Sequence, residues 1–368
     1  MMRSFTLPFI ITTSLFLSAC GGGVSMYRQN AAHTGVASSS APTSQKYINQ
    51  VWKWSAPDKV YASPVVGGDT VYIGCKDGFL YALNLENGDF KWKFKTGANV
   101  EASVAVSGDT VFVGSWDGNL YALDTETGAK KWQVRTEGKV YSSPTIKDGI
   151  LYFGSEDKKL YAVDIDGHRE KWNFPAGKGI YSSPAIYGKY VFVGTMDGYL
   201  HAIDKRSGTE IWKVPTNNVI YSSPATDGKK VYFGSYNKYV YAVDIKSSQV
   251  SWKKKTAGKV FASPAVYGDA IYIGSADTYV YAYDRKTGAR HWEFKTNGPV
   301  YSSPVIASDT LYVGSTDGFL YALNLESEDD RTRVRWKFDT HGKIFSSPTI
   351  AGGKVIFSNK KGEVFAVE

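Results

Sequence analysis

The chain has 368 residues, of which 43% are apolar and 21% are charged, and these fractions are typical of a folded globular protein. They exclude a collagen, a wholly disordered chain and a polytopic membrane protein. The net charge of +8 is modest for this length, and it favours acidic partners or a membrane surface. Only two cysteines are present, Cys20 and Cys75, which excludes a disulfide scaffold and a Cys-rich zinc site.

The first twenty residues predict export and a lipid anchor. A short basic start is followed by an apolar run, residues 5–17, that has the length of a signal peptide and is too short to span a bilayer. The run ends Leu17-Ser18-Ala19-Cys20-Gly21, which resembles the lipobox of bacterial lipoproteins. That resemblance implies a signal peptide over 1–19 and lipidation of Cys20 in the cell envelope, with Gly21 favouring an outer-membrane lipoprotein that faces the periplasm. The alternative is an ordinary secretory signal with a chance cysteine.

Residues 20–48 predict a flexible tether, because they are rich in glycine, serine and alanine. A coil of this kind with about 28 residues would span roughly 30 Å. Within it, Met26–Gly35 is too varied in its side chains to be a pure spacer. This segment resembles one that often precedes repeats of the pyrroloquinoline-quinone (PQQ) type, so we expect part of the tether to pack on the domain.

Residues 49–368 consist of one repeat that occurs eight times. Tryptophan recurs every 40 residues, and the last spacing is lengthened by a four-residue insertion: Trp52, Trp92, Trp132, Trp172, Trp212, Trp252, Trp292 and Trp336. Each unit holds four short runs of β-branched and aromatic residues, separated by Gly, Asp and Asn. Four strands per 40 residues predict a blade, so the fold class is an all-β, single eight-bladed β-propeller of four-stranded blades.

Strand bounds follow from the turn residues. In the third unit they are Val140–Ile146, Ile150–Ser155, Lys159–Asp164 and Lys171–Phe174, from the inner strand to the outer one. The last unit ends after its third strand, whereas residues 51–54 form an outer strand with no blade before it. We therefore expect this N-terminal strand to complete the last blade and close the ring, which removes a free sheet edge.

One motif carries a family resemblance. Ala122-x-Asp124-x-x-Thr127-Gly128-x-x-x-Trp132 resembles the tryptophan-docking motif of PQQ-like propellers, and the resemblance extends over residues 49–368. That group includes quinoprotein dehydrogenases as well as BamB-like lipoproteins of the outer-membrane β-barrel assembly machinery, so the motif implies a fold and not a function.

Two functions are therefore compared. A quinoprotein dehydrogenase would hold PQQ and calcium in the channel, often beneath a disulfide between adjacent cysteines, but this chain has no such pair and its loops are minimal. We expect a non-catalytic, monomeric propeller without a cofactor, tethered to the membrane, that binds an envelope protein partner, with β-barrel assembly as the specific role. The alternative is a PQQ-binding dehydrogenase or a propeller that binds a small ligand.

Residues found in every blade are interpreted as structural, since an eightfold position cannot form one asymmetric active site. These include the serines that begin each inner strand, whose hydroxyl groups can satisfy backbone groups around the channel, and the aspartates of the outer turns. The histidines are scattered without metal-ligand spacing, so no metal site is expected. Nucleic-acid binding is not expected of an exported lipoprotein.

Partner binding requires residues that break the eightfold pattern. Glu101 stands where other units have Tyr or Phe, and the variable position of the second hairpin turn carries Trp116, Met196 and Tyr236, which are residue types enriched at interfaces. A basic group at the channel mouth is predicted from lysines directly before the inner strands, Lys59, Lys139, Lys259 and Lys343, with Lys178 one residue earlier in its unit. The competing interface is the charged insertion at 326–335.

Overall fold

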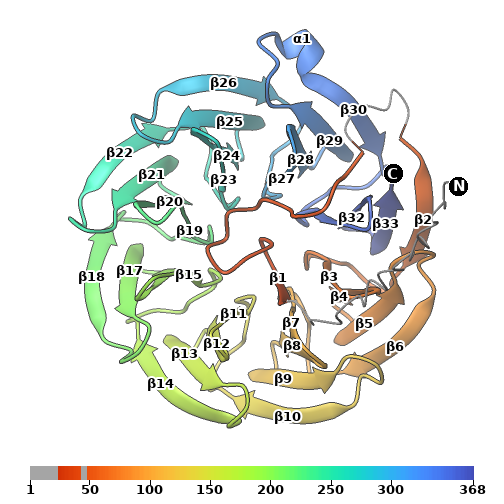
Figure 1. The fold of residues 1–368 in the computed structure, drawn as a ribbon, viewed down its shortest axis with the longest axis vertical. Helices are drawn as coiled ribbons and strands as arrows, with labels where there is room; N and C mark the ends of the chain where they lie inside the picture. Colours follow the sequence, from red (N-terminus) through yellow and green to blue (C-terminus); the bar gives the residue numbers. More distant parts are fainter. Residues whose placement is uncertain (1–23, 43–47) are drawn as a thin grey trace, which may run out of the picture.

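The computed structural model describes residues 24–42 and 48–368 and shows eight β-sheets arranged in a closed ring around a central channel (Figure 1). Within each sheet the strands, named A to D here, follow one another antiparallel from the channel to the rim. The predicted eight-bladed β-propeller is confirmed. The predicted signal peptide and Cys20 lie outside the described residues.

The first four blades share one strand order. Blade 1 contains β3 (Val65–Gly67), β4 (Thr70–Gly74), β5 (Phe79–Asn84) and β6 (Phe90–Lys95). Blade 2 contains β7 (Ala105–Ser107), β8 (Thr110–Gly114), β9 (Asn119–Asp124) and β10 (Lys130–Arg135). Blade 3 contains β11 (Thr145–Lys147), β12 (Ile150–Gly154), β13 (Lys159–Asp164) and β14 (Arg169–Pro175). Blade 4 contains β15 (Ala185–Tyr187), β16 (Tyr190–Gly194), β17 (Tyr199–Asp204) and β18 (Glu210–Pro215).

The remaining blades repeat the order, with an insertion in blade 7. Blade 5 contains β19 (Ala225–Thr226), β20 (Lys230–Gly234), β21 (Tyr239–Asp244) and β22 (Val250–Lys255). Blade 6 contains β23 (Ala265–Tyr267), β24 (Ala270–Gly274), β25 (Tyr279–Asp284) and β26 (Arg290–Lys295). Blade 7 contains β27 (Val305–Ala307), β28 (Thr310–Gly314), β29 (Phe319–Asn324), the helix α1 (Asp330–Arg333) and β30 (Val334–Asp339). Blade 8 contains β31 (Thr349–Ala351), β32 (Lys354–Ser358), β33 (Glu363–Val367) and β2 (Gln50–Ser55).

Blade 8 is built from both ends of the chain, as predicted. Strand β2 pairs antiparallel with β33, and Trp52 lies opposite Ala366. Strands C and D of this blade, β33 and β2, are not consecutive in the chain, so no short turn joins them. The carbonyl of Pro42 takes the place of that turn, since it accepts hydrogen bonds from Trp336 Nε1 at 3.0 Å and from the Tyr312 hydroxyl at 2.8 Å. The N-terminal segment therefore closes the ring twice, through β2 and through Pro42.

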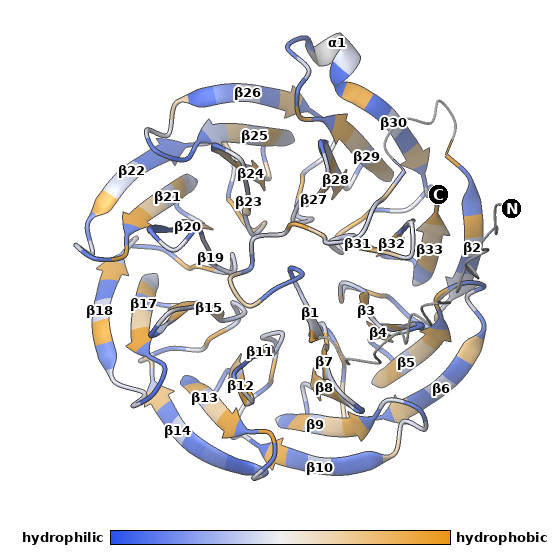
Figure 2. Cartoon of the chain, in the orientation of Figure 1, coloured by the Kyte–Doolittle hydropathy of each residue, from blue (hydrophilic) through white to orange (hydrophobic). Residues whose placement is uncertain are grey.

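The repeated tryptophans join neighbouring blades. Trp92 of blade 1 donates from Nε1 to the carbonyl of Thr125, in the C-to-D turn of blade 2, at 2.9 Å. Gly128 has a φ of +72°, and a Cβ there would lie 2.5 Å from the Trp92 ring, so only glycine fits under the indole. Figure 2 shows outer strands such as β10 coloured mainly hydrophilic and β29 and β33 mainly hydrophobic. The apolar core therefore lies between the blades and inward of the rim.

The inner strands are shorter than the sequence predicts. In blade 3 the ladder begins at Thr145, whereas Val140–Pro144 are irregular. Pro144 has no N–H for a ladder, and the amide of Ser143 donates to the next blade instead, to Ser183 Oγ at 3.0 Å. The predicted start at Val140 was therefore wrong, because this stretch joins blades to each other.

The insertion of blade 7 forms the four-residue helix α1, which projects beyond the rim (Figure 1). No helix among the described residues has the length and apolar character needed to cross a membrane.

Candidate functional site

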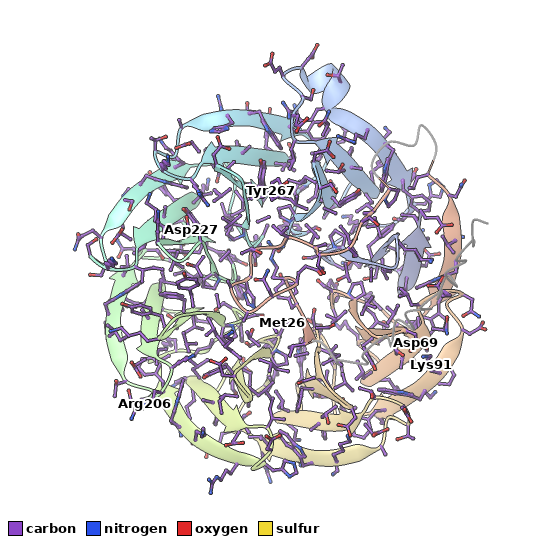
Figure 3. The ribbon with its side chains drawn as sticks, viewed as in Figure 1. Met26, Asp69, Lys91, Arg206, Asp227 and Tyr267 are labelled. Atoms are coloured by element: carbon purple, nitrogen blue, oxygen red, sulfur yellow. The ribbon has the colours of Figure 1, made fainter. Side chains whose placement is uncertain are left out.

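The N-terminal segment, residues 24–42, occupies one end of the channel. Strand β1 (Ser25–Met26) pairs with the inner strand β7 of blade 2, and Figure 3 shows Met26 near the centre of the ring. The chain then turns and follows the inner strands round the channel. Its backbone carbonyls accept from amides of blades 4, 5, 6 and 7, as in Ile186 N to Ala31 O at 2.7 Å and Val266 N to Thr34 O at 2.8 Å. This part of the predicted tether is therefore packed and is not a free spacer.

Two buried side chains fasten this segment. The Arg28 guanidinium donates to the carbonyls of Pro304 at 2.7 Å and Pro264 at 2.6 Å. His33 is fully buried, and its Nε2 lies 3.0 Å from Thr145 Oγ1. Burial, together with the smaller effect of the positive charge of Arg28, lowers the pKa of His33 to about 3, so His33 is neutral at physiological pH.

Inside the channel, the serines that begin the inner strands form a closed ring of hydrogen bonds. Each serine amide donates to the hydroxyl oxygen of the corresponding serine in the next blade, at distances from 2.8 to 3.1 Å. The last of these bonds runs from Ser347 N to Ser63 Oγ and closes the circle. We call this the serine ring; its members are Ser63, Ser103, Ser143, Ser183, Ser223, Ser263, Ser303 and Ser347.

Above the serine ring the channel opens into a funnel of about 190 Å³. Its floor is the serine ring together with Tyr27, whose hydroxyl lies 3.1 Å from Ser303 Oγ. Its wall is a belt with one residue from each blade: Tyr61, Glu101, Tyr141, Tyr181, Tyr221, Phe261, Tyr301 and Phe345. Neighbouring aromatic rings of this belt lie 4.3 to 6.0 Å apart, and the sequence of rings is broken only at Glu101.

Glu101 is the one acidic residue in the wall. Its carboxylate lies 3.7 Å from Lys76 Nζ and is 19% exposed. Burial raises the pKa of Glu101, and the charge of Lys76 opposes that shift. In blade 3, Glu156 accepts a hydrogen bond from the Tyr181 hydroxyl at 2.8 Å. The acidic side of the funnel mouth is therefore formed by blades 2 and 3.

The predicted partner residues lie around this mouth. Trp116 packs on Tyr141 with ring centroids 4.8 Å apart, and Tyr236 packs on Tyr221 at 4.8 Å and on Phe261 at 4.3 Å. Tyr141, Tyr181 and Tyr221 connect the two. Met196 is half-buried in the corresponding turn of blade 4. The structure thus brings Glu101, Trp116, Met196 and Tyr236 to one end of the channel, which we call the funnel face.

The predicted basic residues lie on the funnel face but do not form one even ring. Each B-to-C turn donates an amide to the preceding D-to-A crossing, as from Lys76 N to Lys59 O at 3.0 Å, which places both kinds of loop on this face. Lys139 and Lys259 lie over Trp116 and Tyr236, with Nζ 4.8 and 4.7 Å from the ring centroids. Lys59 and Lys343 line a separate cleft of about 560 Å³ with Lys360 and Lys361, and Lys178 is exposed.

The repeated aspartates are structural, as predicted from the turns. Asp124 Oδ1 accepts the amides of Glu126 and Thr127 and the Thr127 hydroxyl, which caps the C-to-D turn. At the rim, Lys91 Nζ lies 2.7 Å from Asp69 Oδ1, and Figure 3 shows the two residues side by side. These acids bind backbone amides and lysine groups, as expected of turn residues.

One group among the described residues has the composition of a metal site. Asp269, Asp284 and His291 offer ligand atoms within 4.8 Å of one another, at the rim of blade 6. Asp284 Oδ1 already accepts the amides of Lys286 and Thr287. His291 occupies the position that Lys91 has in blade 1, so the His291–Asp284 contact replaces a lysine–aspartate pair found in other blades. The spacing of these residues in the sequence did not indicate the cluster.

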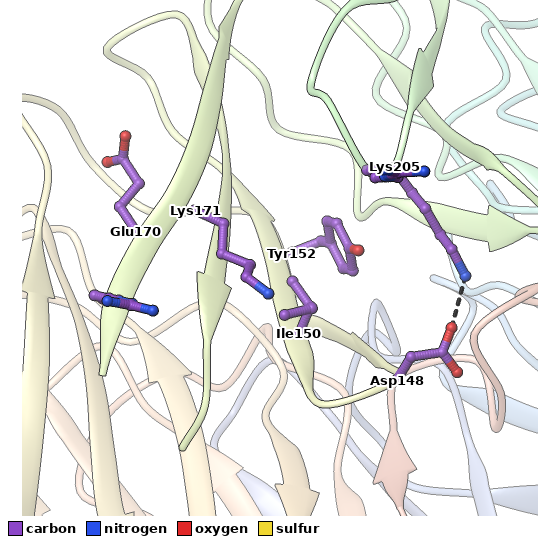
Figure 4. Close-up of a pocket in the computed structure, with 8 residues that line it drawn as sticks. Asp148, Ile150, Tyr152, Glu170, Lys171 and Lys205 are labelled. Atoms are coloured by element: carbon purple, nitrogen blue, oxygen red, sulfur yellow. Dashed lines mark hydrogen bonds and ion pairs between the residues drawn. The ribbon is translucent and has the colours of Figure 1, made fainter. Parts of the chain in front are cut away.

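A larger cleft, of about 620 Å³, lies between blades 3 and 4 (Figure 4). Its lining is charged, and Lys205 Nζ lies 2.6 Å from Asp148 Oδ2 across it. Lys171 is 3.5 Å from Asp164. The lining therefore mixes acidic and basic side chains and does not present a centre of one charge.

The competing insertion lies at the C-to-D turn of blade 7, opposite the funnel face. Arg333 is buried there, with its guanidinium carbon 4.2 Å from the Trp292 ring centroid. Its terminal nitrogens donate to the carbonyls of Asn324 and Ser327. The insertion is therefore anchored to the propeller through Arg333.

Sequence reasoning missed the closed floor of the funnel. The ring of serines was visible as an eightfold position, and Tyr27 and Arg28 stand in the segment Met26–Gly35 that was expected to pack on the domain, but their place at the channel was not predicted. The signal that could have identified them is the density of specific side chains between Met26 and Gly35.

Comparison with known proteins agrees with the fold. The β-propeller of the family described as "Beta-alanine-activating enzyme, beta-propeller" matches residues 186–368. BamB from Moraxella catarrhalis is 20% identical, with a TM-score of 0.73 over 88% of this chain and 98% of BamB. No curated protein sequence matches the chain.

Two further solved structures show how widely the architecture is shared. The computationally designed protein Ika8 is 14% identical, with a TM-score of 0.77 over 86% of this chain and 98% of its own. A europium-containing methanol dehydrogenase is 13% identical, with a TM-score of 0.75 over 93% of this chain and 89% of its own. At these identities the likeness shows an eight-bladed propeller similar to that of BamB, and it does not separate a binding protein from an enzyme.

Proposed function

We propose that this propeller is a non-catalytic lipoprotein of the bacterial outer membrane that binds an envelope protein through its funnel face, in the assembly of outer-membrane β-barrel proteins. One observation carries the proposal. Four residues that depart from the eightfold repeat, Glu101, Trp116, Met196 and Tyr236, lie at one end of the channel. A partner that is not itself eightfold requires such an asymmetric surface.

The chemistry of the funnel face supports this role. Trp and Tyr are enriched at the centres of protein interfaces, and the aromatic arc from Trp116 to Tyr236 presents several such rings side by side. Lys139 and Lys259 lie over the two ends of the arc, so a partner surface with acidic side chains is favoured there. Similarity to BamB supports β-barrel assembly as the specific role, and the lipobox ending at Cys20 supports membrane attachment.

The quinoprotein alternative rests on the similarity to methanol dehydrogenase. The funnel of this chain fits PQQ and calcium poorly. At about 190 Å³ it is smaller than the several hundred Å³ of a typical cofactor pocket. Its one acidic wall residue, Glu101, is paired with Lys76, which leaves no cluster of acids for calcium in the wall.

Photocrosslinking in native envelopes tests the proposal. Benzoylphenylalanine replaces Tyr236 on the funnel face and, as a matched control, the exposed Tyr187 at the end of β15 on the opposite face. We expect a crosslink to a protein of the barrel-assembly machinery from position 236 and none from 187. A dye-linked dehydrogenase assay with added PQQ and calcium accompanies it. Turnover, or crosslinks from position 187 alone, would contradict the proposal.

A further inference from the structure

The serine ring has hydrogen-bonding capacity that the fold does not use. Each hydroxyl oxygen accepts one backbone amide, so its own hydrogen remains available to donate. Ser263 and Ser303 contact the Tyr27 hydroxyl. The other six serine hydroxyls meet no acceptor among the described residues, and they belong to consecutive blades, from blade 8 through blade 1 to blade 5: Ser347, Ser63, Ser103, Ser143, Ser183 and Ser223.

These six hydroxyls are well buried and line the floor of the funnel. Their residues are between 3% and 8% exposed. Because Tyr27 covers only the side of blades 6 and 7, the remaining arc of six donors is open to the funnel. An arc of buried O–H donors favours a ligand group that carries several hydrogen-bond acceptors.

A buried positive charge lies beside this open arc, on the side of blades 6 and 7. Arg28 is 3% exposed, and its guanidinium is bonded to the carbonyls of the two prolines that follow Ser263 and Ser303. No described carboxylate lies within ion-pair distance of Arg28, and its Nε is buried without a hydrogen-bond partner. A buried charge is costly unless an opposite charge is near, so the channel favours an anion that reaches the floor.

The wall of the funnel favours a ligand that has an apolar part. Seven of its eight belt residues are aromatic, and the available volume is about 190 Å³. This admits one group of side-chain size and excludes a multi-ring cofactor. Glu101 does not neutralise the floor, since its charge is offset by Lys76.

We propose that the funnel binds a carboxylate on a short apolar or aromatic group, with the carboxylate oxygens on the serine ring and the apolar part against the tyrosine belt. The carboxylate belongs either to a small organic acid or to the C-terminus of a peptide. The serine hydroxyls donate to the oxygens, and Arg28 supplies the compensating charge from the side of blades 6 and 7. This site does not depend on which partner the funnel face binds.

Four probes distinguish the charge and the source of the ligand. Calorimetric titration of the full-length chain compares 3-phenylpropionate with 3-phenylpropionamide, and N-acetyl-Gly-Gly-Phe carrying a free or an amidated C-terminus. We expect at least one acid to bind about tenfold tighter than its amide. If the small acid binds, a small acid suffices as ligand; if only the peptide acid binds, the source is a peptide C-terminus. Equal affinity of both acids and their amides, or no binding of any probe at about 5 mM, overturns the proposal.

Variants locate the site. In Ser143→Thr/Ser183→Thr the hydroxyl acceptors of the ring remain, but two methyl groups narrow the floor, so acid binding should fall at least tenfold. The matched control is Ser247→Thr on an exposed turn, which should bind the acids as wild type does. In Arg28→Met the preference for acid over amide should disappear, whereas Arg28→Lys should retain it. Should Arg28→Met fail to fold, the serine variants decide, and unchanged acid binding in them refutes the site.

Discussion

Replacing Trp52 with alanine tests how the ring is closed. Trp52 is 6% exposed, packs between blades 8 and 1, and donates from Nε1 to Leu85 O at 2.8 Å. Removal of a buried tryptophan side chain costs about 3–5 kcal/mol of the free energy of unfolding, because the lost contacts are not refilled. Strand β2 has no covalent neighbour within its blade, so it depends on this docking and on its ladder with β33.

The expected consequence is local as well as global. Urea unfolding should show the loss of about 3–5 kcal/mol, and hydrogen exchange should speed up at the amides of β33. The matched variant is Trp172→Ala, whose Nε1 makes the same bond, to Lys205 O at 3.0 Å, from a strand that is continuous with its blade. That variant should lose stability without exposing β33. If β33 stays fully protected in Trp52→Ala, the ring is not held closed at this position.

Three further predictions concern pH, anchoring and charge. Because burial lowers the pKa of His33 to about 3, the unfolded chain binds a proton below about pH 6.5 that the folded chain does not, so stability falls by about 2 kcal/mol from pH 7 to pH 5. His33→Asn, which tolerates the φ of +56° at this position, should remove that loss in urea unfolding, and an equal loss in both proteins would count against it. Cys20→Ala should move the protein from the detergent phase to the aqueous phase, and unchanged partitioning would indicate another anchor. Lys139→Gln/Lys259→Gln should weaken partner binding several-fold at low salt and little at high salt; the absence of any salt-dependent difference would show that these lysines do not contribute.

The fold was predictable because the repeat is nearly uniform. A tryptophan every 40 residues, with a small residue and a glycine at fixed distances, determines where blades meet, and Trp92, Thr125 and Gly128 meet as that pattern requires. The outer strand at Trp52 has no blade before it, and the last unit lacks an outer strand. This pattern predicted the observed pairing of β2 with β33.

The site was predictable only in part. Deviations from the repeat identified Glu101, Trp116 and Tyr236, because each residue could be compared with those at the same position in the other units. The role of Arg28 was not predictable, because it contacts prolines more than 230 positions away and belongs to no repeat. The inner strand was overestimated because a serine amide can bond to a hydroxyl of the next blade as well as to its own sheet.

Affinity for the partner tests the central claim that this propeller binds through its funnel face. The measurement is biolayer interferometry of the full-length chain against the purified β-barrel assembly complex from the same bacterium. Trp116→Ala/Tyr236→Ala should weaken binding by at least about 30-fold, which corresponds to about 2 kcal/mol, whereas deletion of residues 327–332 on the opposite face should leave it unchanged. Wild-type affinity in the double variant, together with loss of binding in the deletion, would contradict the account.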